Sequence, residues 1–379
     1  MDDKGQMDNR IKILFLIHDL GHGGAEKVLV NLVNNMDRSK FDISVTTLFG
    51  GGVNEQSLKP DIRYHAILPK EFHGNSHFMK LLTPRQLHKL FIKETYDIEV
   101  AYLEGPSARI ISGCRNRKTK LVSWIHCTMR QKSEITIGFR NYREACSCYR
   151  RMDMICFVSY GVRDSFLDLC PGVKNTKILY NTNESDKIVQ IKHAAVPAEL
   201  FSAEEFSICG VGKVVPVKGF NRLAHIHKRL RDEKYPVHCY ILGVGSDQTI
   251  IQTYIDENGL GDSFTFLGYQ TNPYKYVSRC DLFVCASHAE GFSTAATEAL
   301  IVGTPVCTVE VSGMKEMLGE NNKYGIVTEN SEEALYEGIK RLLDDPALLA
   351  HYRKQAALRG ERFSTEKTVK AVEDMLLGL

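Results

Sequence analysis

The chain has 379 residues, of which 43% are hydrophobic and 25% charged, and its formal net charge is +2. This length is close to the expectation for two globular domains, and the near-neutral charge gives no reason to expect a nucleic-acid partner. Eleven cysteines, an odd number without a repeating spacing, do not fit a disulfide framework, so a reducing, cytoplasmic environment is predicted. The apolar run ILFLI is far shorter than the ~20 residues that a membrane span needs, so no integral membrane protein is expected.

Short apolar segments alternate with helical patterns along the first half of the chain. We expect residues 1–10 to be a disordered tip or a remnant that precedes a natural start at Met7, and residues 11–190 to form the first domain. Strands are predicted at residues 11–17, 43–48, 98–102, 120–125, 154–158 and 177–180. Such alternation is typical of a parallel sheet with helices on both faces.

Residues 191–203 mix polarity, contain Pro197 and interrupt this rhythm, so they are predicted to form a linker. A second domain is expected at residues 204–363. Its strands are predicted at residues 206–211, 238–242, 263–267, 282–286 and 305–309, and its helices at 220–232, 247–258, 294–301 and 331–344. Residues 364–379 have apolar positions at helical spacing and are predicted to form a last helix. The predicted fold class is α/β, with two Rossmann-like, doubly wound domains that face each other across a cleft and bind ligands at the carboxyl ends of their strands.

Glycines gather directly after the first predicted strand of each domain. The first loop reads HDLGHGGAEKVLV, and its Gly23 and Gly24 stand at the head of a helix, where backbone can approach an anion closely. The second group is Gly210–Gly212. Neither loop fits G-x-G-x-x-G or G-x-x-x-x-G-K-[ST], so these dinucleotide and triphosphatase signatures are excluded.

Two lysines flank the second glycine loop in the stretch GVGKVVPVKGFNRL. Lys213 follows the strand and Lys218 precedes the helix. Ammonium groups at such a position suit the two phosphates of a diphosphate, although lysines near a glycine loop are also common without any function.

Two glutamates frame the stretch AEGFSTAATEAL. Glu290 follows a predicted strand, and Glu298 lies about one turn inside the helix that comes next. The backbone N–H groups of Gly291, Phe292 and Ser293 at the helix start would hold a phosphate or a hydroxyl, and each carboxylate can accept hydrogen bonds from a vicinal diol. The alternative interpretation is a capped surface helix with two solvated glutamates.

Motifs spread over nearly the whole chain resemble one enzyme family. They are, in order, GGAEKVLVNLV, SWIHCT, FVSYGVRDSF, ILYNTNE, KGFNRL, LGVGSD, the Glu290 to Glu298 spacing and EALIVGTPV. Together they are similar to the retaining glycosyltransferases of the GT-B fold, family 4. AYLEGPSARIISG resembles the subset of this family that acts in bacterial surface-polysaccharide assembly.

The resemblance implies a role for each matching residue. His126 would lie near the transferred sugar, Glu290 would hold sugar hydroxyls, and Glu298 the nucleotide ribose. The leaving diphosphate would be neutralised by Lys213 and Lys218. The implied donor-binding residues are Gly23, Gly24, Gly212, Lys213, Lys218, Gly268, Tyr269, Glu290, Gly291, Phe292, Ser293 and Glu298, with backbone groups of residues 266–269 reading the base. The last helix would return to the first domain.

Two positions depart from the family pattern. Lys213 stands where many members have arginine, which removes bidentate phosphate recognition there. SGMKEML at residues 312–318 has serine where a Gly-Gly pair is usual.

The implied activity is that of a hexosyltransferase-type enzyme that moves a sugar from a nucleoside-diphosphate sugar to a glycan or a polyprenyl-linked acceptor. UDP is the commonest donor nucleotide in the family, but no side chain excludes GDP. No two aspartates stand two positions apart, so the D-x-D metal clamp is missing, and neither a metal nor another cofactor is expected. A nucleotide-sugar epimerase on the same fold and a non-catalytic subunit that binds a nucleotide sugar or a glycan remain alternatives.

Basic residues are concentrated in one part of the first half. Residues 80–153 contain 15 Lys or Arg against 7 Asp or Glu. The segment HFMKLLTPRQLHKLFIK at residues 77–93 mixes apolar and cationic positions at helical spacing, as a helix at a membrane surface would. One interpretation is therefore a region that docks on the anionic inner face of the membrane; the other is an ordinary solvated face.

Overall fold

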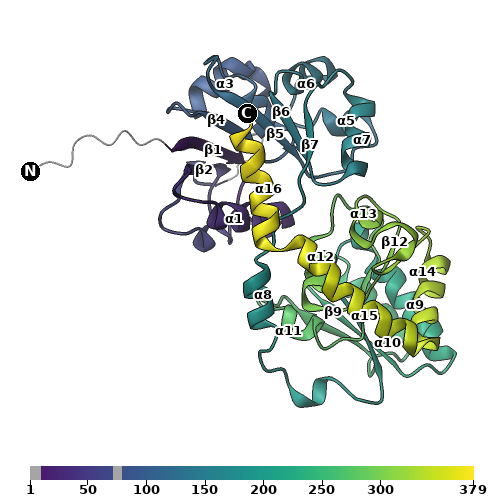
Figure 1. Ribbon diagram of the computed structural model, residues 1–379. Helices are drawn as coiled ribbons and strands as arrows, with labels where there is room; N and C mark the ends of the chain where they lie inside the picture. Colours follow the sequence, from purple (N-terminus) through teal and green to yellow (C-terminus); the bar gives the residue numbers. More distant parts are fainter. Residues whose placement is uncertain (1–9, 71–78) are drawn as a thin grey trace, which may run out of the picture. The chain divides into compact units, whose positions relative to one another are not determined.

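The computed structural model describes residues 10–70 and 79–379, which form two separate α/β units (Figure 1). One unit runs to Thr182 and also includes Glu366–Leu379, while the other comprises Asn183–Thr365. Nearly all of the tip predicted at residues 1–10 lies outside the described residues, as does the start of the amphipathic segment at residues 77–93.

The first unit is built on a seven-stranded parallel sheet with the order β3-β2-β1-β4-β5-β6-β7. Its strands are β1 (Ile11–Ile17), β2 (Phe41–Phe49), β3 (Arg63–Leu68), β4 (Ile98–Ala101), β5 (Lys120–Ile125), β6 (Met154–Phe157) and β7 (Thr176–Ile178). Its helices include α1 (Gly24–Asn35), α3 (Pro84–Phe91), α4 (Pro106–Ile111), α5 (Lys132–Ile135), α6 (Tyr142–Tyr149), α7 (Tyr160–Leu169) and α16 (Thr365–Leu377), with a 3-10 turn η1 (Glu55–Ser57). The backbone N–H of Asp37 donates to Glu373 on α16 at 2.7 Å, which ties the last helix to this unit.

The second unit repeats the plan with six parallel strands in the order β10-β9-β8-β11-β12-β13. The strands are β8 (Phe206–Val211), β9 (Val237–Leu242), β10 (Phe264–Gly268), β11 (Leu282–Cys285), β12 (Val306–Val309) and β13 (Ile326–Thr328). The helices are α8 (Ser185–Ile191), α9 (Phe220–Asp232), α10 (Gln248–Glu257), α11 (Tyr274–Val277), α12 (Thr294–Val302), α13 (Met314–Leu318), α14 (Glu332–Asp344) and α15 (Pro346–Gly360). Four 3-10 turns, η2 (Ala198–Leu200), η3 (Pro216–Lys218), η4 (Glu320–Asn322) and η5 (Glu361–Phe363), complete it.

In both sheets the strand order reverses between the first and the fourth strand in sequence, so later strands are added on the opposite side of the first strand. β1 is followed on one side by β2 and on the other by β4, and β8 likewise stands between β9 and β11. The central strands are buried on both faces, as the apolar run ILFLI of β1 illustrates. The predicted fold class of two doubly wound α/β domains is confirmed. In such sheets, the loops at the carboxyl ends of the two diverging strands are the expected ligand site.

The structure corrects the predicted linker at residues 191–203, because the units divide at residues 182–183. The polar segment that follows is anchored to the second unit. Asn272 donates to the carbonyl of Ile191 at 2.8 Å, Lys192 donates to the carbonyl of Val302 at 3.2 Å, and Tyr240 donates to that of Leu200. Its mixed polarity is that of a surface helix and loop, not of a connection between domains.

Two strands were not predicted. β3, with the sequence RYHAIL, and β13, with only three residues, both lie at the outer edge of their sheets. Both are partly exposed and too short or too polar to show the continuous apolar run by which the central strands were found.

The basic stretch at residues 80–153 is partly internal. The guanidinium of Arg109 is 1% exposed, pairs with Glu144 at 3.0 Å and donates to the carbonyls of Met79 and Leu82. Arg140 donates to the carbonyls of Lys80 and Leu81. The amphipathic segment is not one helix, because Thr83 caps a new helix that begins at Pro84. None of the helices in residues 10–70 and 79–379 combines the length and the apolar character that a bilayer span needs.

We predict that Arg109→Met destabilises the first unit by about 3 kcal/mol or more, because it leaves Glu144 and two carbonyls without their buried donor. Trp124, the only tryptophan, lies in this unit and reports urea unfolding by its fluorescence. Arg63→Met is the matched control. It removes an exposed pair with Asp42 at 3.0 Å, so a loss below about 1 kcal/mol is expected. Equal losses in the two variants would refute the anchoring role of Arg109.

Candidate functional site

The loops after β8 and β11 lie side by side, because these two strands are neighbours at the point where the strand order of the second sheet reverses. The loop after β8 leads through η3 into α9, and the loop after β11 leads into α12. Lys213 and Lys218 belong to the first loop, and Glu290 to the second. Lys218 and Glu290, two of the residues that the sequence singled out in this half, therefore meet although they are 72 positions apart in the chain.

Lys218 and Glu290 form an ion pair. The ammonium Nζ of Lys218 lies 2.7 Å from Oε1 of Glu290, and the hydroxyl of Ser287 donates to the same oxygen at 2.6 Å. The two side chains are 29% and 10% exposed, respectively. Sequence reasoning assigned these residues to different parts of a ligand and did not foresee that they contact each other. The pair holds a partly buried carboxylate and an ammonium ready at the strand ends.

A close backbone contact brings the two loops together. Gly219 has φ of 66°, and a Cβ atom there would lie 2.0 Å from the carbonyl oxygen of Ala286. The backbone N–H of His288 also donates to the carbonyl of Val217 at 2.8 Å. Only glycine permits this approach, which places Lys218 within reach of Glu290.

Arg222 is the residue of this region that sequence reasoning missed. Its guanidinium is buried and donates to the carbonyls of Ala286 and Ser287 at 2.6 and 2.9 Å and to Asn330 at 2.9 Å. It thus fixes the loop that carries Glu290. The signal was present in the motif KGFNRL, which ends one residue after this arginine, but a helical arginine is usually read as a solvated side chain.

Gly212 lies against Lys218, since a Cβ atom at Gly212 would stand 3.7 Å from Cε of that lysine. Lys213 is exposed near the start of the same loop, two residues after β8. Tyr269 is 62% exposed and follows Gly268 at the end of the edge strand β10. Gly268 accepts a hydrogen bond from the N–H of Gly243 at 2.8 Å, which links the loops after β9 and β10.

Glu298 is buried inside α12. The hydroxyl of Tyr274 donates to its Oε1 at 2.8 Å, and Glu298 is 7% exposed. Nearer the helix start, Ser293 accepts from the N–H of Ala296 and acts as the cap, while Phe292 is buried against Phe363. The Ser293 hydroxyl is therefore used by the helix itself, and Gly291 is the residue of this corner with no side chain in the way.

In the first unit, Gly23 and Gly24 begin α1 after the loop of β1. A Cβ atom at Gly23 would lie 1.8 Å from Oε2 of Glu26, so the carboxylate of Glu26 folds over the helix start. Asp19 bonds to His18 at 2.7 Å and to the N–H of Gly21 at 2.6 Å. An anion at this helix start would have to displace Glu26, which sequence reasoning did not consider.

His126 follows β5 and is 8% exposed. Its ring packs against Tyr102 and Trp124, with centroids 5.0 and 6.5 Å away, and its buried Nε2 has no hydrogen-bond partner among the described residues. Burial lowers the pKa of His126 to about 3, against a smaller opposing effect of a hydrogen bond to the Tyr102 backbone. His126 is thus a neutral imidazole with one unused nitrogen.

Glu104 also belongs to this corner, and sequence reasoning missed it. Its Oε2 accepts the backbone N–H of His126 at 3.0 Å, and burial raises the pKa of this carboxyl. Glu104 lies in AYLEGP, directly beyond the carboxyl end of β4. Its position was the available signal, because carboxylates at strand ends of such sheets are candidates for ligand contact.

Two family profiles match the chain. The profile described as Glycosyltransferase Family 4 matches residues 22–182, and that of Glycosyl transferases group 1 matches residues 193–359. The first covers most of the first unit and the second most of the other.

Relatives and solved structures agree with the profiles. The N-acetylgalactosamine-N,N'-diacetylbacillosaminyl-diphospho-undecaprenol 4-alpha-N-acetylgalactosaminyltransferase of Campylobacter jejuni is 26% identical over 375 residues, which are 97% of this chain and 100% of that protein. The lipopolysaccharide core biosynthesis glycosyltransferase LpsE of Rhizobium meliloti is 21% identical over 359 residues, 94% of this chain and 95% of that protein. The crystal structure of Anabaena HepE with UDP has a TM-score of 0.77 at 19% identity, covering 97% of this chain and 100% of that one, which shows the shared fold.

We predict that His126 makes the first unit sensitive to acid. Its folded pKa of about 3 lies below the ordinary value near 6.5, so the unfolded chain binds this proton first and stability falls as the pH falls from 6.5 toward 3. One such group contributes a slope of about 1.4 kcal/mol per pH unit well below pH 6.5. Urea unfolding followed by Trp124 fluorescence from pH 7 to 4.5 should show a smaller slope for His126→Gln than for the wild type. Identical slopes would contradict the buried, neutral state of His126.

Proposed function

This chain belongs to the family 4 glycosyltransferases of the GT-B fold, and we propose that it transfers a sugar, with retention of configuration, from a UDP-sugar to a glycan or lipid-linked acceptor in polysaccharide biosynthesis. Two relatives support the acceptor class by their names, one acting on a diphospho-undecaprenol-linked sugar and one in lipopolysaccharide core biosynthesis. The donor class is supported by the HepE structures with UDP and with UDP-glucose.

The observation that carries the proposal is the Lys218–Glu290 pair at the diverging strands β8 and β11. An arriving nucleotide sugar offers a diphosphate to the ammonium and hydroxyl donors to the carboxylate. Both groups then exchange one strong partner for another, so neither charge is left buried alone. Gly212 beside Lys218 and Gly291 beside Glu290 have no side chains, so the protein backbone at these positions can approach the ligand closely.

Catalysis in this proposal rests on charge that develops on the leaving diphosphate. Lys218, exposed Lys213 and the N–H groups at the start of α12 stabilise that charge without a metal ion, as preorganised donors do in other transfer reactions. Glu290 binds hydroxyls of the sugar and is not a nucleophile. The donor phosphate oxygen takes the proton of the acceptor hydroxyl on the same face, the bond from sugar to phosphate breaks, and the bond from sugar to acceptor forms.

His126 contributes a neutral hydrogen-bonding group. Its unused Nε2 can bond a substrate hydroxyl, and burial keeps the imidazole uncharged. A cation at this position would repel the positive charge that the sugar ring acquires in the transition state, so a low pKa suits the reaction.

The test begins with a thermal-shift panel of UDP, GDP, ADP and NAD. At a hundredfold excess over Kd the preferred nucleotide adds about 2.7 kcal/mol, which is several degrees for domains of this size. UDP is expected to give the largest shift, and Lys218→Met should weaken UDP binding roughly tenfold or more because a charge-assisted bond is lost. A shift with NAD alone would overturn the donor assignment.

The transfer assay completes this experiment. Glu290→Gln should lower kcat about a hundredfold, because a neutral amide holds the sugar hydroxyls more weakly than a carboxylate and leaves Lys218 without its counter-charge. The matched control is Glu233→Gln, which breaks a lysine–glutamate pair of the same 2.7 Å length with Lys340 at the opposite edge of the sheet. Full activity of Glu290→Gln would remove the residue from the mechanism. Conversion of the nucleotide sugar without an acceptor product would indicate an epimerase instead.

We further propose that exposed cations of the first unit meet an anionic membrane surface that carries the acceptor. Arg109 is buried, whereas Arg85, Lys89, Lys93 and Arg115 are exposed. Clustered cations near anionic headgroups gain about 1 kcal/mol each, and salt screens the attraction. Sedimentation with phosphatidylglycerol vesicles should therefore occur at low salt and decline at high salt, whereas binding that ignores anionic lipid would refute the idea.

A further inference from the structure

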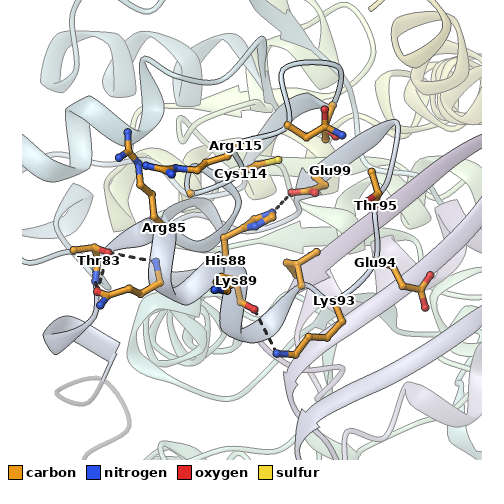
Figure 2. Close-up of a pocket in the computed structure, with 15 residues that line it drawn as sticks. Thr83, Arg85, His88, Lys89, Lys93, Glu94, Thr95, Glu99, Cys114 and Arg115 are labelled. Carbon is orange, nitrogen blue, oxygen red and sulfur yellow. Dashed lines mark hydrogen bonds and ion pairs between the residues drawn. The ribbon is translucent and has the colours of Figure 1, made fainter.

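A hollow of about 620 Å³ lies in the first unit beside α3 (Figure 2). It is lined by residues of α3, by Glu99 near the start of β4, and by residues 113–119 ahead of β5. Because β4 and β5 are parallel, their amino ends lie together beside the hollow. Glu104 and His126 follow the carboxyl ends of these strands. The hollow is thus separate from the residues proposed to act in transfer.

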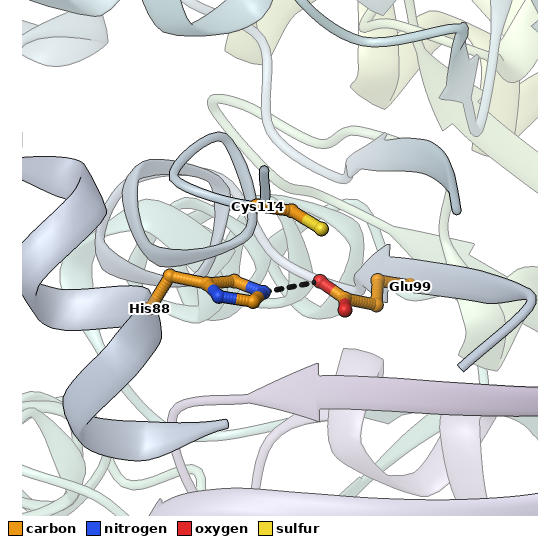
Figure 3. Close-up of side chains that lie close together, drawn as sticks. All are labelled: His88, Glu99 and Cys114. Carbon is orange, nitrogen blue, oxygen red and sulfur yellow. Dashed lines mark hydrogen bonds and ion pairs between the residues drawn. The ribbon is translucent and has the colours of Figure 1, made fainter. Parts of the chain in front are cut away.

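Three metal-binding side chains meet in this hollow. Nε2 of His88 lies 2.8 Å from Oε2 of Glu99, and one ligand atom from each of His88, Glu99 and Cys114 lies within 4.8 Å of the others. Figure 3 shows the imidazole and the Cys114 sulfur directed toward the Glu99 carboxylate. The three residues come from α3, from β4 and from the segment after α4, so only the folded chain assembles them.

Glu99 is the most telling member of the group. It stands on a central strand, paired with Leu14 of β1 and Leu121 of β5, and is 1% exposed. Central strands of parallel sheets are apolar, and burying a carboxylate there is costly unless it is paired or binds a metal. A carboxylate at this place therefore needs a cationic partner, and either the protonated imidazole of His88 or a metal ion bound by the group can supply it.

The backbone around the group is built for close approach. A Cβ atom at Gly113 would lie 2.0 Å from the carbonyl oxygen of Pro84 and 2.9 Å from Cβ of His88. Glycine at this position lets the segment touch α3 and sets Cys114 beside His88. A capping box of Thr83 and Gln86 fixes the start of the same helix one turn before His88.

We propose that His88, Glu99 and Cys114 bind a Zn²⁺ ion, with the fourth position open to the hollow. Imidazole nitrogen, carboxylate oxygen and thiolate sulfur are the three ligand types that zinc accepts, and three protein ligands with one open position are typical of its tetrahedral sites. Zn²⁺ with one carboxylate and one thiolate is neutral overall, which suits burial. The inference goes beyond the proposed transfer reaction and does not depend on it.

Binding requires a small rearrangement and the release of protons. Ligand distances of 2.0 to 2.3 Å in a tetrahedron separate ligand atoms by about 3.3 Å, so His88 and Glu99 must move apart by roughly half an ångström. The proton between His88 and Glu99 and the thiol proton of Cys114 leave to solvent. The rim cations Arg85, Lys89, Lys93 and Arg115 are exposed, so solvent screens their repulsion of the ion, and they favour an anionic fourth ligand.

The experiment uses Co²⁺ as the probe on the full chain after treatment with EDTA and dialysis. One Co²⁺ per chain is expected to bind and to give the thiolate-to-cobalt charge-transfer absorption, which Zn²⁺ then displaces. Cys114→Ser should abolish that absorption, while Cys148→Ser, which changes another buried cysteine of the same unit, should leave it intact. His88→Gln should lower Co²⁺ affinity at least about tenfold.

Trp124 fluorescence and circular dichroism establish that each variant is folded before it is scored. Wild-type protein without the charge-transfer absorption at excess Co²⁺ would overturn the proposal, as would an absorption that survives Cys114→Ser. If Cys114→Ser fails to fold, the affinity of folded His88→Gln decides: an unchanged value refutes the site. UDP binding in the second unit is expected to be unaffected throughout, so failure here leaves the transferase proposal standing.

Discussion

The ion pair between Lys218 and Glu290 depends on one close backbone contact, that of Gly219 with the carbonyl of Ala286. Any side chain at Gly219 would push η3 away from the loop after β11 and separate the two charges. Arg222 stabilises the same contact by donating hydrogen bonds to the carbonyls of Ala286 and Ser287. The site is therefore a property of the backbone of two neighbouring loops, and its charged side chains are placed by that backbone.

This arrangement explains why an ammonium and a carboxylate can coexist, partly buried, before a ligand arrives. Each is the partner of the other, so the folded protein carries no uncompensated charge at the strand ends. A ligand with both a diphosphate and hydroxyl groups matches the two halves of the pair at once. A ligand with only one of these groups would leave the other residue of the pair without a partner. Binding of nucleotide sugars is therefore favoured over binding of nucleotides or sugars alone.

Sequence patterns sufficed for the repeated α/β plan, because central strands such as β1 are apolar along their whole length. They also located Lys218 and Glu290, since both stand where a strand ends and a helix begins. They could not reveal the contact between the two, which depends on the order of strands β8 and β11. The same limitation hid Arg222 and the placement of Glu104 beside His126.

Strands β3 and β13 and the anchored segment after Asn183 were not predicted, because exposure gives them the composition of loops. A count of charges in the basic stretch could not separate buried from exposed cations, and Arg109 is buried with its donors on Glu144 and on backbone carbonyls.

The first unit holds two histidines whose surroundings drive them in opposite directions. Burial lowers the pKa of His126 to about 3, and its ring packs against the aromatic side chains of Tyr102 and Trp124. Burial also acts to lower the pKa of His88, but hydrogen bonds to Cys114 and Glu99 outweigh it and raise the value to about 9. The imidazole at the carboxyl ends of the strands is thus kept neutral, as its proposed contact with a substrate hydroxyl requires, whereas the imidazole at the amino ends lies beside a carboxylate and a thiol. Glu99 pairs with the imidazole of His88, whereas Glu104 accepts the backbone N–H of His126 and burial raises the pKa of its carboxyl, so the two carboxyls have different partners.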